Sequence, residues 1–215
     1  MDTELMLKSI PFLIKGTIMT LKLSAVSVLV GSILGLFAGL ARVSKYKILN
    51  WIAVGYSDFF RGTPLIVQLF IIYFAIPSIL HLNIEPFAAC IIACGLNSGA
   101  YISEIVKGGI QSIDIGQTEA GKSLGLNNFQ VMFYIIFPQA IKRILPAMGN
   151  EFIGLLKGTS IVSVIGMREL TREGQLIIAR TYASFEIWLM VAIFYLILVV
   201  SLSRLITFAE RRLND

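Results

Sequence analysis

Long apolar runs, separated by shorter polar segments, form the main pattern of the chain. Five of these runs are long enough to cross the roughly 30 Å hydrocarbon layer of a bilayer as helices. They lie at about residues 23–41, 62–79, 86–106, 139–161 and 187–202, and the last can continue to residue 208. Pro146 predicts an early break in the fourth run. The pattern therefore predicts an all-α integral membrane protein with five transmembrane helices, which we treat as one transmembrane domain of residues 1–215.

One polar, charged stretch lies between the third and fourth runs. Residues 117–124 can form a short helix, with Thr118 as its N-cap, Glu119 in its first turn and Gly125 as a left-handed stop. Because such a short helix is marginal in water, it needs a partner surface, which can belong to another protein. A surface helix at about residues 127–137 is expected to follow. The simpler alternative is an amphipathic loop helix that only lies on the membrane surface.

The composition agrees with a location in a membrane. The 215 residues are 56% hydrophobic and 14% charged, and the mean hydropathy is +0.81, whereas soluble domains are about half apolar and a quarter charged. The net charge of +5 comes mostly from basic residues beside apolar runs, and no basic stripe with aromatic residues indicates a nucleic acid partner. Cys90 and Cys94 lie on one face of an apolar helix without a cluster of other ligands, so we expect no metal site.

The charges of the loops predict which ends of the chain face the cytoplasm. Three basic residues follow the first run, while residues 77–86 contain none, so the positive-inside rule puts the first of these loops in the cytoplasm. The N-terminus is then outside, and the arginine-rich C-terminus is inside. Three lysines near the N-terminus argue against this orientation. The connection at residues 167–185, which we expect to be an exposed outer segment, also contains arginines. It is only weak evidence against the orientation, because it is long and its positive and negative charges balance. The basic residues of the first loop are Arg42, Lys45 and Lys47. Those near the N-terminus are Lys8, Lys15 and Lys22, and those near the C-terminus are Arg204, Arg211 and Arg212.

Two of the predicted spans have a polar face. In the third span, helical spacing puts four residues on one face: Asn97, Tyr101, Glu104 and Gly108. A carboxylate at this depth costs several kcal/mol unless it is paired or hydrated, so Glu104 should face a cavity, a substrate or a cationic partner. The structural alternative is an ion pair with Lys107 or Arg61, with Asn97 and Ser98 acting only as hydrogen-bonding groups between helices.

The fourth span has a comparable face. Ala147, Glu151, Gly154 and Gly158 share it at helical spacing, which permits close approach of another helix around a central carboxylate. Lys157, Thr159 and Ser160 lie toward its outer end. Two interpretations remain open: Glu151 and Lys157 belong to a buried polar network, or this face shares a central cavity with the face that carries Glu104.

Several motifs in combination resemble the permease subunits of ABC importers for polar amino acids. Within the polar stretch, the residues that resemble the cytoplasmic EAA loop of that family are Glu119-Ala120-Gly121, Leu124-Gly125, Phe137-Pro138-Gln139-Ala140 and Pro146. Further matches lie at residues 60–68, 96–110 and 149–160, so the resemblance covers nearly the whole chain. The chain departs from the family pattern at Gly121, where the motif has alanine, and at Gly158, where an acidic residue is common.

This resemblance implies a fold and a set of partners. It implies the ABC importer permease fold, with a cytoplasmic coupling helix in a loop at about residues 111–137, in the cytoplasmic membrane of a prokaryote. The implied partners are a second permease subunit, identical or closely related, two cytoplasmic ATPase subunits, an extracytoplasmic amino-acid-binding protein and the amino acid itself. The implied residues of ATPase coupling are Glu119, Ala120, Gly121, Leu124 and Gly125.

The same resemblance implies a substrate site but no catalytic site. The candidate substrate-binding residues are Asn97, Ser98, Tyr101, Glu104, Glu151, Thr159 and Ser160. Glu104 would suit a cationic side chain, although the α-ammonium group of any amino acid can use the same carboxylate. The sequence has no phosphate-binding G-x-x-x-x-G-K-[ST] motif, so we expect no cofactor on this chain, with ATP and Mg²⁺ bound to the partner ATPase.

Two other classes of membrane protein are alternatives to a transport permease. A secondary transporter, driven by an ion gradient, should show paired repeats or broken helices in two halves, which five spans and a docking loop fit poorly. A purely structural membrane subunit would tolerate loss of charge at Glu104, so Glu104→Gln in a protein that still assembles would separate it from a transport subunit. An enzyme has the least support, because no nucleophile is accompanied by a base.

Overall fold

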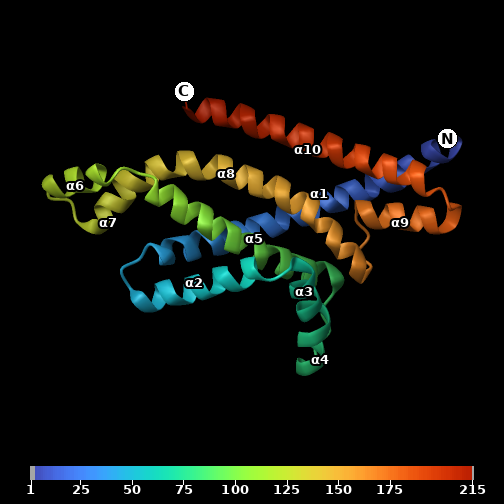
Figure 1. Cartoon of the computed structure of the whole chain (residues 1–215), viewed down its shortest axis with the longest axis horizontal. Coiled ribbons are helices and arrows are strands. Elements are labelled where there is room, and N and C mark those ends of the chain that lie inside the picture. Colours follow the sequence, from blue (N-terminus) through green and yellow to red (C-terminus); the bar gives the residue numbers. More distant parts are fainter. Residues whose placement is uncertain (1–2, 215) are drawn as a thin grey trace.

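The computed structural model describes residues 3–214, which are helical almost throughout (Figure 1). The longest helices are α1 (Thr3–Arg42), α5 (Pro86–Gln111), α8 (Phe137–Gly158) and α10 (Ser184–Asn214). The shorter helices are α2 (Lys47–Gly62), α3 (Leu65–Phe70), α4 (Ile76–Leu80), α6 (Ile115–Ser123), α7 (Asn128–Gln130) and α9 (Leu170–Thr181). Three irregular helical segments complete the chain: η1 (Ile71–Ala75) and η2 (Val131–Ile136), which are π-helical, and η3 (Thr159–Ile165), which is 3₁₀.

The structure confirms an all-α fold with up to five membrane-crossing segments. Four helical stretches among the described residues are long and apolar enough to span a bilayer: Glu4–Arg42, Pro86–Gln111, Asn128–Ile165 and Ser184–Arg212. The fifth candidate is a bent pair, Lys47–Gly62 followed by Leu65–Leu80, whose two parts meet at 104°. The predicted number of spans is therefore correct when the bent pair counts as one span.

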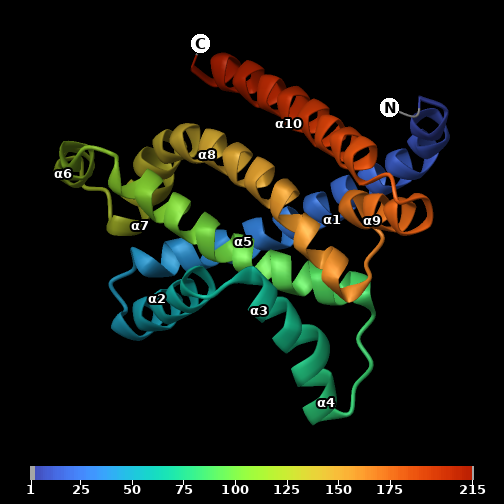
Figure 2. The ribbon, with the colours of Figure 1, turned by 45° about the vertical axis from the view of Figure 1, so that its right-hand side comes forward.

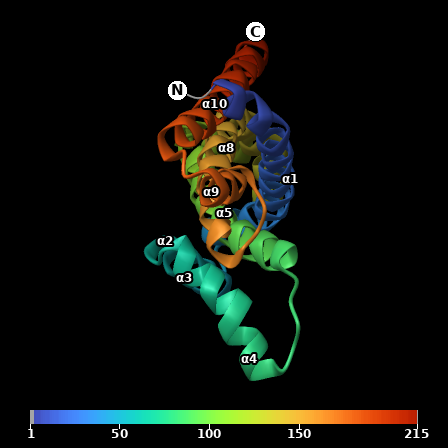
Figure 3. The same cartoon turned by 90° about the vertical axis from the view of Figure 1, so that its right-hand side faces the viewer.

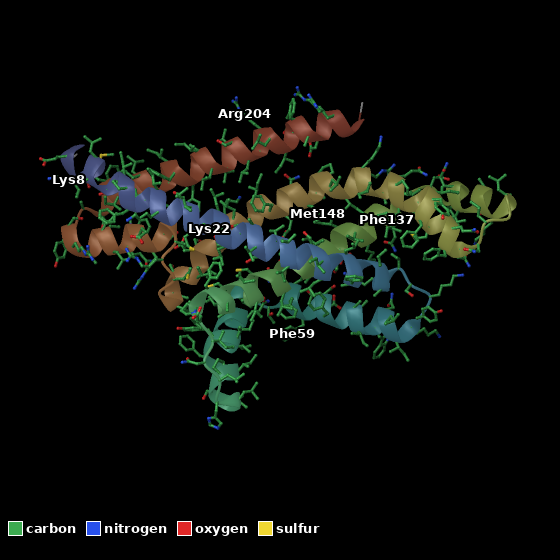
Figure 4. All side chains as sticks on the ribbon, turned by 180° about the vertical axis from the view of Figure 1, so that it is seen from behind. Lys8, Lys22, Phe59, Phe137, Met148 and Arg204 are labelled. Atoms are coloured by element: carbon green, nitrogen blue, oxygen red, sulfur yellow. The ribbon has the colours of Figure 1, made fainter. Side chains whose placement is uncertain are left out.

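The first helix is much longer than the predicted run at residues 23–41. It begins at Thr3, so the polar leader is part of the same helix. The lysines of this leader lie seven residues apart, which puts them on one helical face, and all three are exposed. Lys8 and Lys22 lie along α1 in Figure 4. A helix can therefore absorb these charges without interrupting its apolar contacts on the opposite face.

The second span differs most from the prediction. Residues 47–62 form α2, so the polar loop after α1 is confined to residues 43–46. The span therefore does not begin at Gly62, as the apolar run predicted. It breaks after Gly62 because Pro64 disfavours helical geometry at the preceding residue; Thr63 is extended, with φ −119° and ψ 146°. Pro64 precedes the first residue of α3 instead of occupying a helical turn. Beyond this break, α3, η1 and α4 project from the bundle (Figure 3).

The fourth span is continuous, so the predicted break at Pro146 and the separate surface helix at residues 127–137 are both wrong. Helical structure runs from Asn128 to Ile165, and Pro146 lies within α8. A proline removes one backbone hydrogen bond. Membrane helices tolerate this when neighbouring groups satisfy the carbonyl that is released.

The connection at residues 167–185 is partly buried, although it was expected to be exposed. It contains α9, whose N-cap Glu169 is fully buried and accepts hydrogen bonds from the N–H groups of Thr171 (2.9 Å) and Arg172 (2.8 Å). Burial raises the pKa of Glu169 above its ordinary value, and the two backbone hydrogen bonds act in the opposite direction. Glu173 is also buried and pairs with Arg168 at 2.8 Å. Within this connection, one acidic residue therefore caps α9 and another pairs with a nearby arginine.

The centre of the fold is the crossing of α1 and α5 (Figure 2). Gly31, Gly35 and Gly39 lie on the face of α1 that meets α5. A Cβ atom on Gly35 would come within 2.6 Å of the Ile102 side chain and 2.8 Å of the Gly99 carbonyl oxygen. Without side chains at these positions the two backbones approach closely, which is how helices associate in lipid. Small residues at this spacing in an apolar helix are typical of such a packing role.

Candidate functional site: a coupling loop and an intramembrane ion cluster

The polar loop between α5 and α8 forms a small lobe at one end of the molecule (Figure 1). Its helix α6 follows Asp114, whose carboxylate accepts a hydrogen bond from the N–H of Gly116 at 2.7 Å. The predicted N-cap at Thr118 is therefore wrong and Glu119 lies beyond the first turn, because Asp114, a strong N-capping residue, starts the helix earlier. Gly125 ends the helical region as predicted, in the left-handed conformation with φ +81°.

The tip of this lobe is exposed and partly apolar. Leu124 is 81% exposed and Ile115 is 69% exposed. Among the other predicted coupling residues, Glu119, Ala120 and Gly125 are also exposed. Exposed large apolar side chains next to a carboxylate are typical of a surface that another protein covers. The role of these residues in ATPase coupling stays a prediction.

Gly121 is the buried member of the predicted coupling residues. It packs against η2, where an added Cβ atom would lie 2.7 Å from Ile135 Cδ1 and 2.9 Å from Val131 Cγ2. The capping box of Asn127 and Gln130 fixes the start of the helical segment that provides this surface. The small residue at the third position of the motif thus attaches α6 to the long helix that follows.

We expect Gly121→Ala to be tolerated and Gly121→Leu to detach α6. Alanine displaces the flexible end of Ile135 and also presses against Val131 Cγ2, and its higher helix propensity, worth up to about 1 kcal/mol, offsets part of this cost. Leucine cannot fit between α6 and η2. Limited proteolysis of the purified protein should cut residues 111–137 several-fold faster in Gly121→Leu than in wild type. Equal protection of the leucine variant would contradict the packing described for Gly121.

The second feature is an ion cluster around Glu104 on α5. Arg42 Nη1 lies 2.7 Å and Arg61 Nη1 lies 2.5 Å from Glu104 Oε2, and Lys107 Nζ lies 3.4 Å from Oε1. Arg42 is buried, with 6% of its side chain exposed, and it also donates to Ser103 Oγ at 3.3 Å. The structural alternative of an ion pair with Arg61 or Lys107 is therefore realised, and Arg42 joins it. The cluster holds one carboxylate and three cations.

Asn97 lies beside the break between α2 and α3. Its amide donates to the Phe60 carbonyl and to Gln68 Oε1, both at 3.0 Å. The Gln68 amide in turn donates to the carbonyls of Phe60 (2.8 Å) and Thr63 (3.0 Å). These carbonyls lie at the end of α2, where the helix leaves them without intrahelical partners. Asn97 therefore stabilises the break, and its predicted contact with substrate stays untested.

The polar faces of α5 and α8 meet at Ser98 and Glu151. The Ser98 hydroxyl is buried and forms no hydrogen bond of ordinary geometry within the described chain, but it lies close enough to interact with the Glu151 carboxyl group. Lys157 is exposed, and no ion pair joins it to Glu151 within residues 3–214. This arrangement favours a shared polar face over a Glu151–Lys157 pair.

The remaining candidate substrate residues lie in two places. Tyr101 is 41% exposed, and its ring centre lies 5.7 Å from the Arg61 guanidinium carbon, so it belongs to the Glu104 region. Thr159 is fully buried at the start of η3 and donates to the Leu156 carbonyl at 2.8 Å, whereas Ser160 is half-buried. In this conformation Tyr101 and Glu104 are accessible and Thr159 is not.

Sequence reasoning missed Arg42 and Gln68 as members of this region. Arg42 was considered only as a charge of the loop after the first span. However, it lies three residues after Gly39 and so continues the face of α1 that packs on α5. That spacing is the signal that could have identified it. Gln68 carried no such signal, because its role depends on a helix break that hydropathy does not reveal.

Comparisons with known proteins agree on one class of membrane protein. The glutamine transport system permease protein GlnP of Escherichia coli K12 is 44% identical over 207 residues, which cover 96% of this chain and 94% of the relative. The arginine transport system permease protein ArtQ of Bacillus subtilis 168 is 40% identical over 215 residues, covering 100% of this chain and 98% of the relative. The similarity therefore extends over essentially whole proteins.

Solved structures give the same result. The crystal structure of an amino acid ABC transporter with histidines matches with a TM-score of 0.94 and 44% identity, covering 99% of both chains. An inward-facing MetNI methionine ABC transporter matches with a TM-score of 0.75 at 24% identity over 94% of both chains, which supports the fold alone. The family model described as binding-protein-dependent transport system inner membrane component matches residues 31–215. The chain thus belongs to the family of these inner membrane components and is a permease subunit of an ABC importer.

Proposed function

We propose that this permease carries a polar amino acid into the cytoplasm of a prokaryote, with energy from separate ATPase subunits. The observation that carries the proposal is the similarity along the whole chain to permeases named for glutamine and arginine transport. The α6 lobe, exposed at its tip and attached through Gly121 to the helix that becomes α8, is suited to receive an ATPase. ATP and Mg²⁺ bind to that partner in this proposal.

The shape of the chain is compatible with the proposed orientation. The α6 lobe lies at one end of the molecule, and α9 and the N-terminal end of α1 lie at the other (Figure 1). If α6 docks on a cytoplasmic ATPase, the N-terminus is outside, α10 returns the C-terminus toward the inside, and α9 is on the side from which a binding protein delivers the amino acid. A second permease subunit, identical or closely related, completes the polar pathway, because one chain leaves Glu104 and Tyr101 partly exposed.

The proposal is tested by Glu119→Lys in the permease coexpressed with its cognate ABC ATPase. Reversal of charge on the exposed face of α6 is expected to lower copurification of the ATPase at least ten-fold. It should also abolish the stimulation of ATP hydrolysis by amino acid and binding protein in liposomes. Glu85→Lys is the matched control, since Glu85 is exposed in the loop predicted to lie outside; it should behave like wild type.

Uptake of radiolabelled glutamine and arginine by the same liposomes identifies the cargo. ATP-dependent uptake of either compound supports an amino acid importer. Uptake that follows an imposed ion gradient without ATP, or ATPase capture that ignores Glu119, would instead favour the ion-coupled or purely structural alternatives.

A further inference from the structure

An open groove of about 730 Å³ lies between α1 and α2. Both helices pack on α5. The first does so through Gly35 and its neighbouring glycines, and the second through the Tyr56 hydroxyl, which donates to the Leu96 carbonyl at 2.7 Å. Leu96 of α5 lines the groove together with residues of α1 and α2. The groove therefore results from the way in which three helices pack.

The walls of this groove are apolar. Leu34 and Phe37 of α1 and Leu49 and Ile52 of α2 line it, and their side chains are 37–68% exposed. The smaller Ala38 lines it as well. Its volume lies within the range of about 300–1,000 Å³ that is usual for sites of small molecules. In a membrane-crossing segment such a groove suits a hydrocarbon chain.

The cytoplasmic end of the groove carries positive charge without partners. Lys45 lies in the loop after α1, and Lys47 is the first residue of α2. Lys47 lines an adjoining hollow that shares Tyr46 and Leu49 with the groove. Both lysines are exposed, and neither forms an ion pair within residues 3–214. Two free cations at the end of an apolar groove match a lipid whose head group is negative.

Two aromatic residues place this end of the groove at the surface of the membrane. Tyr46 is 74% exposed and Trp51 is 81% exposed, and exposed tyrosine and tryptophan are typical of the level of the lipid head groups. The loop between α1 and α2 lies at the same end of the molecule as the α6 lobe (Figure 1). In the orientation proposed above, the groove therefore opens to the cytoplasmic leaflet, whose surface is negatively charged.

We propose that this groove binds an anionic phospholipid, with an acyl chain between α1 and α2 and the phosphate of the head group on Lys45 and Lys47. Lysine side chains are long enough to reach a head group while their stems stay on apolar surface. The leaflet depends on the proposed orientation, but the site itself does not. The other occupant to consider is a helix of a second permease copy. It fits the charges less well, because the lightly buried α10 itself ends with Arg211 and Arg212.

The test is native mass spectrometry of the purified permease–ATPase complex, released from nanodiscs with equal amounts of phosphatidylglycerol and phosphatidylcholine that carry the same acyl chains. Wild type should retain phosphatidylglycerol about ten-fold or more over phosphatidylcholine. Lys45→Gln combined with Lys47→Gln should remove this preference. The matched control is Lys15→Gln combined with Lys22→Gln, which removes two exposed charges from α1 outside the groove and should keep it. Ala38→Phe, which fills the groove, should lower the retention of both lipids.

Two results would overturn the lipid site: equal retention of the two lipids by wild type, or a full preference in the variant that lacks Lys45 and Lys47. The masses also report the number of permease copies. If Ala38→Phe lowers that number and leaves lipid retention unchanged, the groove is an interface between copies and the lipid site is overturned. Amino acid transport is measured separately by the uptake assay described above, so the two proposals can fail independently. The comparison of lipids on wild type needs no variant, so a poorly folded variant does not prevent the test.

Discussion

Replacement of Gly35 by valine is expected to separate α1 from α5 and to remove most of the folded permease. The added side chain would collide with Ile102 and with the backbone carbonyl of Gly99, at 2.8 Å from the Cβ position. A backbone atom in the middle of a helix cannot move aside, so the cost should reach the upper end for overpacking, about 3 kcal/mol or more. The midpoint of unfolding in sodium dodecyl sulfate, followed by circular dichroism, measures the loss.

The control for this experiment is Gly55→Val on α2. Apart from its own helix backbone and chain neighbours, no atom of residues 3–214 lies within 4 Å of a Cβ built at Gly55, so valine meets open space there. A small change in the unfolding midpoint is expected. If Gly35→Val is as stable as Gly55→Val, the crossing of α1 and α5 is not the close contact described above.

The second large effect is expected for Glu104→Gln. Loss of the carboxylate leaves the Arg42 guanidinium buried with only Ser103 as a partner. Removing one member of a fully buried ion pair typically costs about 3–5 kcal/mol, because the remaining charge is uncompensated. Here Arg42 is buried but the Glu104 side chain is 36% exposed, so the loss should lie below that range. We therefore expect Glu104→Gln to reduce both the yield and the unfolding midpoint of the permease, measured as above.

A compensating variant identifies the cause of this loss. Arg42→Met combined with Glu104→Gln removes the stranded charge and should restore most of the stability, because apolar residues often replace buried ion pairs without cost. The double variant would still lack amino acid binding if Glu104 holds the substrate ammonium group. Failure of Arg42→Met to restore stability would show that Glu104 supports the fold through other contacts.

The sequence predicted the class of fold from the length of its apolar runs, and the motifs predicted the family. It did not predict where helices break, and two prolines show why. Pro64 coincides with a break because Thr63 becomes extended and the carbonyls of α2 find a new partner in Gln68. Pro146 lies inside a continuous helix. The residue type is the same, and the difference lies in tertiary contacts that local pattern does not contain.

The candidate site was predictable to a similar extent. Glu104 was identified as a candidate because a charge inside a membrane is costly, and Arg61 and Lys107 were predicted as its possible partners. Arg42 was treated only as a marker of orientation, because it was assigned to the loop after the first run, whereas it is the last residue of α1 and packs on α5. Asn97 was predicted either to bind substrate or to join helices by hydrogen bonds; its amide holds the end of α2, and its contact with substrate stays a prediction. Polar residues in a span therefore indicate a need for partners before they indicate a ligand.

The attachment of α6 at Gly121 has a mechanical consequence. The helical segment that begins beside it extends for 38 residues, from Asn128 to Ile165, a contour of about 57 Å at 1.5 Å per residue. A rotation of about 5° at the α6 end would displace the far end of a rod of this length by about 5 Å. The loop and the segment would thus act as a lever: a small movement of α6 at one membrane face would become a larger displacement at the other face.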